Sequence, residues 1–130
     1  MGFLGDLLRT PDAQSDPHHW AATFMAHRDV GLGLWAVAAM IIDVWTAVIL
    51  VSVGYLVLWE GAQLWRAARQ GKRILPAAWD GFLDTVALTS GCYAAACLVK
   101  GLWMDAIFCW FAMLIVISVG WAQRAGRQTR

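Results

Sequence analysis

Apolar residues run almost without interruption over positions 20–64, which form the first long hydrophobic stretch of the chain. A straight helix of that length would measure roughly 67 Å at about 1.5 Å per residue, whereas the hydrocarbon core of a bilayer is about 30 Å thick. The stretch must therefore fold back on itself. Asp43 is the natural place for the turn, because a charge in mid-membrane is costly and the neighbouring Trp45 suits the membrane interface.

The alternation of apolar runs and polar breaks predicts four membrane-spanning helices. Residues 10–19 are polar and contain two prolines, of which Pro17 can mark the start of a helix. Residues 66–79 form a polar and basic loop, and Lys100-Gly101 separates the last two apolar runs. We therefore expect an all-α fold, namely a polytopic membrane protein built as a four-transmembrane-helix bundle. Its helices are expected at about 19–41, 44–66, 80–99 and 102–122.

The ends of the chain complete this single membrane domain, residues 1–130. Residues 1–18 are predicted to hold a short N-terminal amphipathic segment and a loop. Asp6 lies inside the opening apolar stretch and no basic region precedes it, which does not fit a secretory signal. The segment suits the membrane surface and equally suits a frayed end. Residues 123–130 form a basic tail that is expected to fray.

The composition is that of a chain in contact with lipid. Of the 130 residues, 60% are hydrophobic and 15% are charged, whereas a soluble domain typically has about 45–50% apolar and about 25% charged residues. A formal net charge of +1 gives no reason to expect nucleic-acid binding. Cys92, Cys97 and Cys109 lie in apolar runs without metal-ligand spacing, so we expect buried small side chains, no metal and no cofactor.

The distribution of lysine and arginine sets the expected orientation. The loop at residues 66–73 carries four basic residues and the tail at 124–130 carries three, out of ten in the whole chain. Short basic loops stay on the cytoplasmic side of a membrane. Because four helices place this loop and both termini on one side, we expect a protein of the bacterial inner (plasma) membrane with both termini cytoplasmic.

A three-helix count is the alternative. If Arg28 and Asp29 are too polar for the membrane, the first helix begins only at Val30. Residues 30–65 would then form one long tilted helix or two short ones. That layout, with the N-terminus outside, is similar to small phage holins of the three-span kind.

Polar residues inside the apolar segments converge at one level of the predicted bundle. Intramembrane ionisable groups are expensive and are therefore functional candidates. At about 1.5 Å per residue, they fall in the cytoplasmic half of the bilayer on three different helices. Such a cluster either binds a cation or a polar headgroup, or forms a closed hydrogen-bond network that joins the helices. The members of this predicted cluster are His27, Glu60, Gln63, Asp80 and Asp84.

Small and aromatic residues add two expectations. Small residues permit close approach of helices, either within one bundle or in an oligomer. They are Gly31, Gly33, Gly54, Ser90, Gly91, Ala94 and Ala95. Six of the nine tryptophans fall near predicted helix ends, as expected of an interfacial aromatic belt. These six are Trp20, Trp45, Trp65, Trp79, Trp103 and Trp121.

The polar residues also follow a recognisable order along the chain. His27 comes first, and Glu60-x-x-Gln63 closes an apolar helix before the basic loop. Trp79-Asp80-x-x-x-Asp84 then precedes a stretch that contains Gly91. This order, over roughly residues 18–95, resembles the VanZ-like family of small membrane proteins, and it is also similar to small polytopic membrane proteins of phage genomes. The resemblance implies a role at the cell envelope, linked to glycopeptide resistance in the named member, without supplying a mechanism.

Four hypotheses for the function follow. The first is a non-enzymatic, VanZ-like envelope protein whose polar cluster binds a small polar group or stabilises the fold. The second is a holin-type membrane permeabiliser or lysis accessory, and the third is a subunit of a larger membrane complex. The fourth is a membrane enzyme acting on lipid-linked substrates, although no catalytic motif indicates one. The expected partners are the lipid bilayer and either further copies of the chain or other membrane proteins.

Overall fold

Four helical rods joined by short turns make up residues 16–128, the part of the chain that the computed structural model describes. The second rod has three consecutive parts, α3, a π-helix η2 and α4, whereas each other rod is a single α-helix. No strand occurs within residues 16–128, so the predicted all-α class is confirmed. The predicted amphipathic segment falls almost entirely on residues 1–15 and lies outside the described residues. The elements are α2 (Pro17–Ala39), α3 (Val44–Gly54), η2 (Tyr55–Glu60), α4 (Gly61–Arg69), α5 (Ile74–Val99) and α6 (Trp103–Gln128).

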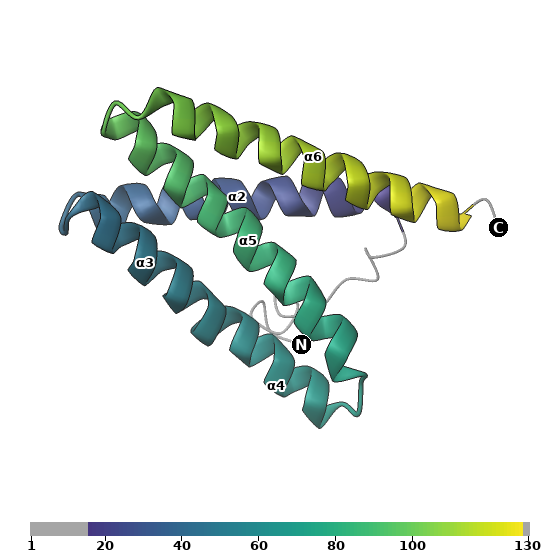
Figure 1. Ribbon diagram of the computed structural model, residues 1–130. Coiled ribbons are helices and arrows are strands. Elements are labelled where there is room, and N and C mark those ends of the chain that lie inside the picture. The colour runs from purple at the N-terminus through teal and green to yellow at the C-terminus, as the bar shows by residue number, and fades with distance from the viewer. Residues whose placement is uncertain (1–15, 129–130) are drawn as a thin grey trace.

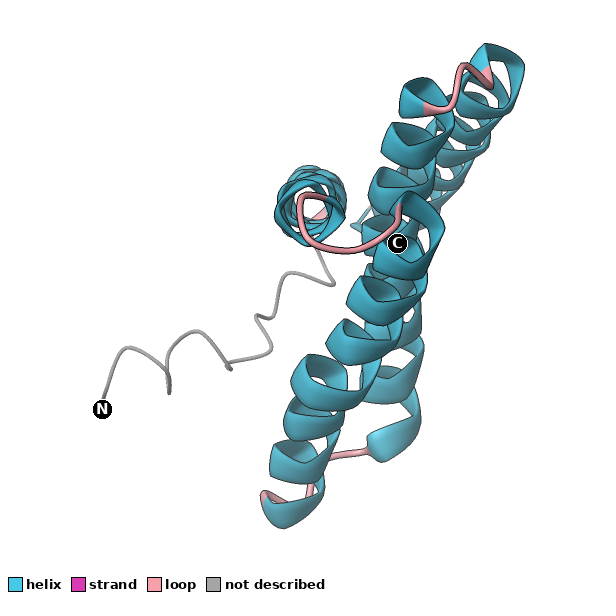
Figure 2. Cartoon of the chain, turned by 90° about the vertical axis from the view of Figure 1, so that its left-hand side faces the viewer, coloured by secondary structure: helices cyan, strands magenta, loops and turns pink. Residues whose placement is uncertain are grey.

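The central element is α5, which packs against all the other described helices. Figure 1 shows α5 running diagonally between α6 and the α3–η2–α4 rod, and Figure 2 shows α2 nearly end-on against one face of these three rods. The α2–α3 and α5–α6 turns lie at one end of the bundle. The start of α2, the α4–α5 turn and the end of α6 lie at the other, which we call the basic end after residues 66–73 and 124–128.

The first long apolar stretch folds back at Asp43, as predicted. Helix α2 ends at Ala39, and the Asp43 side chain accepts hydrogen bonds from the backbone N–H groups of Trp45 and Thr46 at 3.0 and 3.2 Å. An N-cap of this kind satisfies donors that the first turn of a helix leaves unpaired. The Trp35 indole Nε1–H donates to the carbonyl oxygen of Val44 at 3.1 Å, which ties the end of α2 to the start of α3.

Removing the Asp43 cap is expected to lower the thermal stability of the bundle in a pH-dependent way. Hydrogen bonds from the hydroxyl and N–H of Thr46, and from the N–H of Trp45, hold the pKa of the Asp43 carboxyl below its usual range. Because the Asp43 pKa is lower in the folded state than in the unfolded state, its ionised carboxyl stabilises the fold at pH values above the unfolded pKa. This contribution is lost as the pH falls through the folded pKa. Melting curves by circular dichroism in detergent should therefore separate wild type from Asp43→Ala at neutral pH and converge in strong acid. Asp43→Asn, which keeps a capping oxygen, should lose less at neutral pH.

Two predicted helix boundaries are wrong. Helix α5 begins at Ile74 rather than at residue 80, because Pro76 sits in the first turn, where its missing N–H would have no helical partner in any case. The basic tail predicted to fray over 123–130 is helical as far as Gln128, where the described residues end. The α5–α6 turn lies at Lys100-Gly101 as predicted, and Gly101 has a φ of 74°, a conformation that glycine adopts without strain.

Small residues bring α2 and α5 into close contact. A Cβ atom on Gly31 would collide with the carbonyl oxygen of Leu88, and one on Gly91 would collide with that of Arg28. The Cys92 thiol donates a hydrogen bond to the carbonyl oxygen of Gly31 at 3.2 Å. The predicted close approach is therefore confirmed at Gly31 and Gly91, where it joins two helices of the same chain. At Gly33 and Gly54 a Cβ atom would have nothing within 4 Å, so the prediction is wrong at these two positions.

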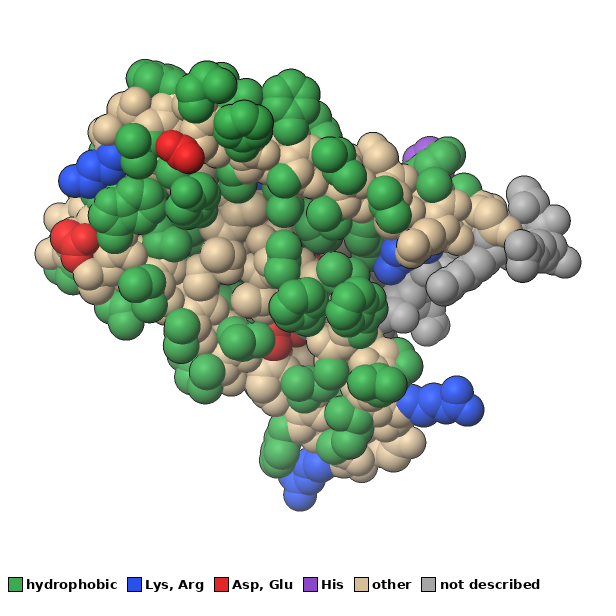
Figure 3. Space-filling model, in the orientation of Figure 1, with side chains coloured by type: hydrophobic (Ala, Val, Ile, Leu, Met, Phe, Trp, Pro, Cys, Tyr) green, Lys and Arg blue, Asp and Glu red, His purple; other side chains and the backbone are tan. Residues whose placement is uncertain are grey.

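Three of the four rods are long and apolar enough to cross a membrane: Val44–Arg69, Ile74–Val99 and Trp103–Gly126. Large apolar side chains cover much of the visible surface in Figure 3, as the surface of a membrane-embedded bundle requires. The helix α2, which contains Arg28 and Asp29, is not one of these three. The described part of the chain is thus an all-helical protein with three helices compatible with membrane insertion.

Five of the six tryptophans predicted at the interface are exposed close to the ends of rods. Trp20 is the exception, with 4% of its surface exposed. Its ring lies 5.3 Å from that of Phe24, and the guanidinium of Arg124 stacks on it at 4.1 Å. The belt prediction for Trp20 is therefore wrong, because packing between α2 and α6 buries this side chain.

Candidate functional site

The candidate site lies where α2, η2 and α5 meet, and it begins with His27 on α2. The His27 Nδ1 atom is 2.8 Å from the carbonyl oxygen of Thr23 and 3.5 Å from Oδ1 of Asp84 on α5. A carbonyl oxygen can only accept, so Nδ1 must carry a proton and donate it. The backbone of α2 and the Asp84 carboxylate of α5 therefore both hold the His27 ring in place. The Tyr55 ring contacts it edge-on, with 6.0 Å between the ring centres.

Glu60 is the most deeply buried polar residue of the site, with 3% of its surface exposed. Its carboxyl lies against α5 at Gly81, where a Cβ atom would collide with Oε2. The glycine thus leaves the space that the carboxyl fills. The other oxygen, Oε1, has no hydrogen-bond partner among residues 16–128. A buried polar atom without a partner costs about 1–3 kcal/mol, so folding alone gives no reason for an acid at this place.

The π-helix η2 explains how Tyr55 joins the site. Residues five apart point to different faces of an α-helix, but the i to i+5 repeat of a π-helix places them one above the other. Tyr55 opens η2 and Glu60 closes it, so both side chains face α2 and α5. The Tyr55 hydroxyl is close enough to Glu60 to interact with it electrostatically, although it too has no hydrogen-bond partner within the described residues.

The structure brings together four of the five predicted site residues. Asp80 interacts electrostatically with His27, Glu60 and Asp84. Gln63 is half-buried on α4, one turn after Glu60, and no hydrogen bond within residues 16–128 links it to the others. We therefore define the polar cluster without Gln63 and with one residue that was not predicted. Its members are His27, Tyr55, Glu60, Asp80 and Asp84.

The polar cluster has an excess of acidic groups. Three carboxyl groups face one imidazole, and charges taken out of water are stable only when they are paired or neutralised. A proton or a cation would supply the missing positive charge. Within residues 16–128, no three His, Cys, Asp or Glu side chains are grouped closely enough to hold a metal ion.

A cavity of about 450 Å³ adjoins the polar cluster at Asp80. It lies at the basic end of the bundle, between the start of α2, the start of α5 and the end of α6. Trp20, Asp80 and Arg124 contribute to its wall, together with apolar side chains of α5 and α6. Its volume falls within the range of about 300–1,000 Å³ that is typical of ligand pockets. Asp80 is the member of the polar cluster that lines it.

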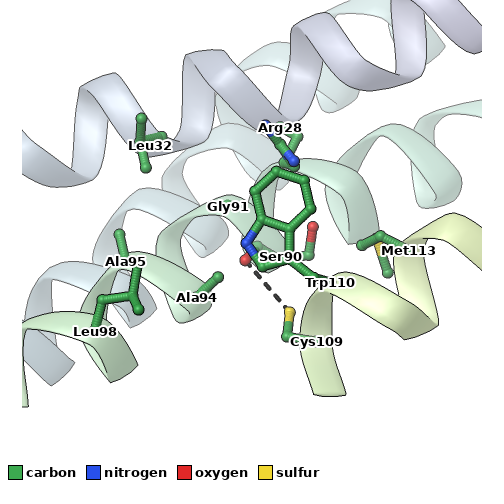
Figure 4. Close-up of a pocket in the computed structure, with 10 residues that line it drawn as sticks. All are labelled: Arg28, Leu32, Ser90, Gly91, Ala94, Ala95, Leu98, Cys109, Trp110 and Met113. Atoms are coloured by element: carbon green, nitrogen blue, oxygen red, sulfur yellow. Dashed lines mark hydrogen bonds between the residues drawn. The ribbon is translucent and has the colours of Figure 1, made fainter. Parts of the chain in front are cut away.

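A second, smaller pocket lies further along the same three helices, α2, α5 and α6, and is explained by packing. Figure 4 shows Arg28 above the indole of Trp110, and the guanidinium carbon lies 3.8 Å from the ring centre. Asp29 Oδ1 accepts a hydrogen bond from Arg28 Nη2 at 2.8 Å, which neutralises the charge. The Cys109 thiol donates to the carbonyl oxygen of Ser90 at 3.5 Å across the pocket. We assign no ligand to this pocket.

Sequence reasoning missed Tyr55 and Gly81. Tyr55 is separated from Glu60 by five residues, a spacing that carries no signal unless a π-helix is known to be present. Gly81 lies between Asp80 and Asp84 in the sequence. A glycine directly after one of the predicted site acids could have indicated a place without a side chain next to the cluster. Only the structure shows that the Gly81 position receives a side chain from another helix.

The class of protein is therefore an all-helical bundle with membrane-compatible helices and an acidic cluster between three of its elements. No protein-family model, no curated protein and no solved structure matches the chain.

Proposed function

We propose that the chain is a small protein of the bacterial inner membrane whose polar cluster binds a small cationic group. The observation that carries this proposal is the Glu60 carboxyl, which is buried at 3% exposure with Oε1 unpartnered within the described residues. Asp80 and Asp84 add further negative charge around it. An ionisable residue inside a membrane is costly and marks a functional site by default, and a bound cationic group would give the unpartnered oxygen a partner.

Binding can be tested with ethanolamine hydrochloride as the probe. A ligand that binds only the folded state stabilises it, by about 2.7 kcal/mol at a hundredfold excess over Kd. The purified protein in detergent should therefore melt at a higher temperature in ethanolamine hydrochloride than in sodium chloride of equal ionic strength. Glu60→Gln should remove the difference, and Asp105→Asn, an exposed acid in the first turn of α6, should keep it. Equal melting temperatures in the two salts would remove the case for a cation site.

The proposal includes four membrane spans with both termini in the cytoplasm. The start of α2, the basic turn at residues 70–73 and the end of α6 share one end of the bundle, which supports this orientation. The α2 helix packs along α5 and α6, which leaves His27 and Arg28 half-buried. Arg28 also pairs with the exposed Asp29 on the same helix, which lowers the cost of placing both charges in a membrane.

Reporter fusions give the test of this topology. Fusions after residues 43, 75, 101 and 130 should report outside, inside, outside and inside, respectively. Alkaline phosphatase, active only outside the cytoplasm, and a fluorescent protein, active only inside, should give complementary patterns. A cytoplasmic signal at residue 43 would end the four-span proposal and favour the three-span alternative.

The envelope role implied by the resemblance to VanZ-like proteins belongs to the same proposal and stays a prediction from the motif order. The holin-type role and the role as a subunit of a membrane complex also stay predictions from the sequence. Induced expression separates the first two, because a holin stops growth abruptly and releases a co-expressed endolysin, whereas an envelope protein does neither.

A further inference from the structure

We propose that the cavity beside Asp80 binds the headgroup of a phospholipid that carries a primary ammonium group. In this arrangement the lipid phosphate lies at Arg124 and the ammonium lies at Asp80, on the rim of the polar cluster. The inference deepens the proposed function and rests on it, since the ligand named here is the source of the cationic group. Three features of the cavity carry it: a fixed cation, an uncompensated acid and a position among exposed apolar side chains.

The fixed cation is Arg124, near the end of α6. Its guanidinium stacks on the Trp20 ring at 4.1 Å, and Nη1 donates to the carbonyl oxygen of Gly120 at 3.1 Å. A Cβ atom on Gly120 would collide with the Trp20 ring, so glycine allows the ring to lie under the guanidinium. An immobilised guanidinium presents several N–H donors in one plane, which matches the oxygen geometry of a phosphate group.

The uncompensated acid is Asp80, which lines the same cavity on the α5 side. Glu60, with its unpartnered Oε1, and Asp84 do not line the cavity, but both interact electrostatically with Asp80. A primary ammonium has three N–H donors and can bond to several carboxyl oxygens at once. A quaternary ammonium has no N–H donor, so the site should distinguish ethanolamine headgroups from choline headgroups.

The position of the cavity suits a lipid in the membrane. The cavity lies at the basic end of the bundle, where a headgroup meets the interface, and Trp79 on its wall is 62% exposed. Ile115 and Val119 line the cavity and are also exposed on the outer face of α6, so they offer a path for acyl chains from the cavity to the bilayer. The volume of about 450 Å³ accommodates a headgroup and leaves the acyl chains outside.

The experiment compares three lipids with identical acyl chains, bearing ethanolamine, choline or glycerol headgroups. Native mass spectrometry of the full-length protein in detergent would measure the fraction of protein that retains each lipid. We expect the ethanolamine lipid to bind at least tenfold more tightly than the other two. Equal binding of all three lipids, or tightest binding of the glycerol lipid, would overturn the inference without any variant being needed.

Variants locate the site on the protein. Asp80→Asn and Arg124→Gln should each abolish the preference for the ethanolamine lipid. The matched control is Arg69→Gln, because Arg69 also stacks on a tryptophan, Trp65 at 4.6 Å, near the same end of the bundle but away from the cavity. A preference that survives both cavity substitutions would overturn the proposed placement of the headgroup.

The two proposals fail in different ways. Stabilisation by free ethanolamine that depends on Glu60, without any lipid preference, would leave the cation site standing and exclude the lipid. A lipid preference that depends on Arg124 but not on Glu60 would also overturn the arrangement, because the ammonium would then lie elsewhere. The absence of both effects would overturn both proposals.

Discussion

Substitution of Gly91 by alanine is expected to destabilise the bundle by about 2 kcal/mol or more. The added Cβ atom would meet the backbone carbonyl oxygen of Arg28, and a backbone atom cannot move aside as a flexible side chain can. Overpacking of this kind costs about 1–3 kcal/mol. Gly31→Ala should have an effect of similar size, because its Cβ atom meets the carbonyl oxygen of Leu88. Unfolding by a denaturing detergent, followed by circular dichroism, would measure both effects.

Gly33 provides the matched control on the same helix. A Cβ atom at Gly33 has nothing within 4 Å, so Gly33→Ala should leave stability unchanged or raise it slightly through better helix propensity. A loss at Gly33 as large as the loss at Gly91 would show that helix flexibility, rather than the α2–α5 contact, sets the stability of the fold.

Substitution of Glu60 by methionine is expected to separate stability from binding. Methionine fills about the same space beside Gly81 and removes the unpartnered Oε1 atom. A buried polar atom without a partner costs about 1–3 kcal/mol, and an apolar side chain of similar volume removes that cost. The Glu60→Met protein should therefore be at least as stable as wild type and should show no response to ethanolamine. Such an exchange of stability for function is common at binding sites.

Glu60→Ala and Asp105→Ala complete this comparison. Glu60→Ala should also lose the response to ethanolamine and, in addition, lose stability because it leaves a space at Gly81. Asp105→Ala should change neither property, since Asp105 is exposed at the opposite end of the bundle. If Glu60→Met proves as destabilising as Glu60→Ala, the cluster is a structural network, and the binding proposal loses its main support.

The number and order of helical rods could be predicted because they depend on two strong physical effects. A 45-residue apolar run cannot be one membrane helix, and the cost of a buried charge placed its turn at Asp43. The start of α2 at Pro17 likewise follows from the fixed φ and missing N–H of proline. These predictions needed no information about which helices touch.

The errors came from features that depend on neighbours in space or on context. Pro76 is compatible both with a loop and with the first turn of a helix, and only the structure distinguishes them. Trp20 is a tryptophan near the end of a helix, as is typical of interfacial residues, but its contacts with Phe24 and Arg124 bury it. The convergence of His27, Glu60 and Asp84 at one level was predicted from helix rise alone, whereas the contribution of Tyr55 was not, because an α-helical wheel places it elsewhere.

The π-helix has one more consequence, for which side chains face the inside of the bundle. The residues of α3 that face the core, such as Ala47 and Val48, are spaced as an α-helix requires. If this spacing continued past Tyr55, positions 59, 62 and 66 would face the core next. The wider turn of η2 advances this set by one residue, or about 100° of rotation. Glu60 and Ala67 are accordingly buried, and the arginine at position 66 is displaced from that row. An unbroken α-helix would turn Trp59 inward in place of Glu60, so the Glu60 carboxyl reaches the polar cluster because of the helical register that η2 sets.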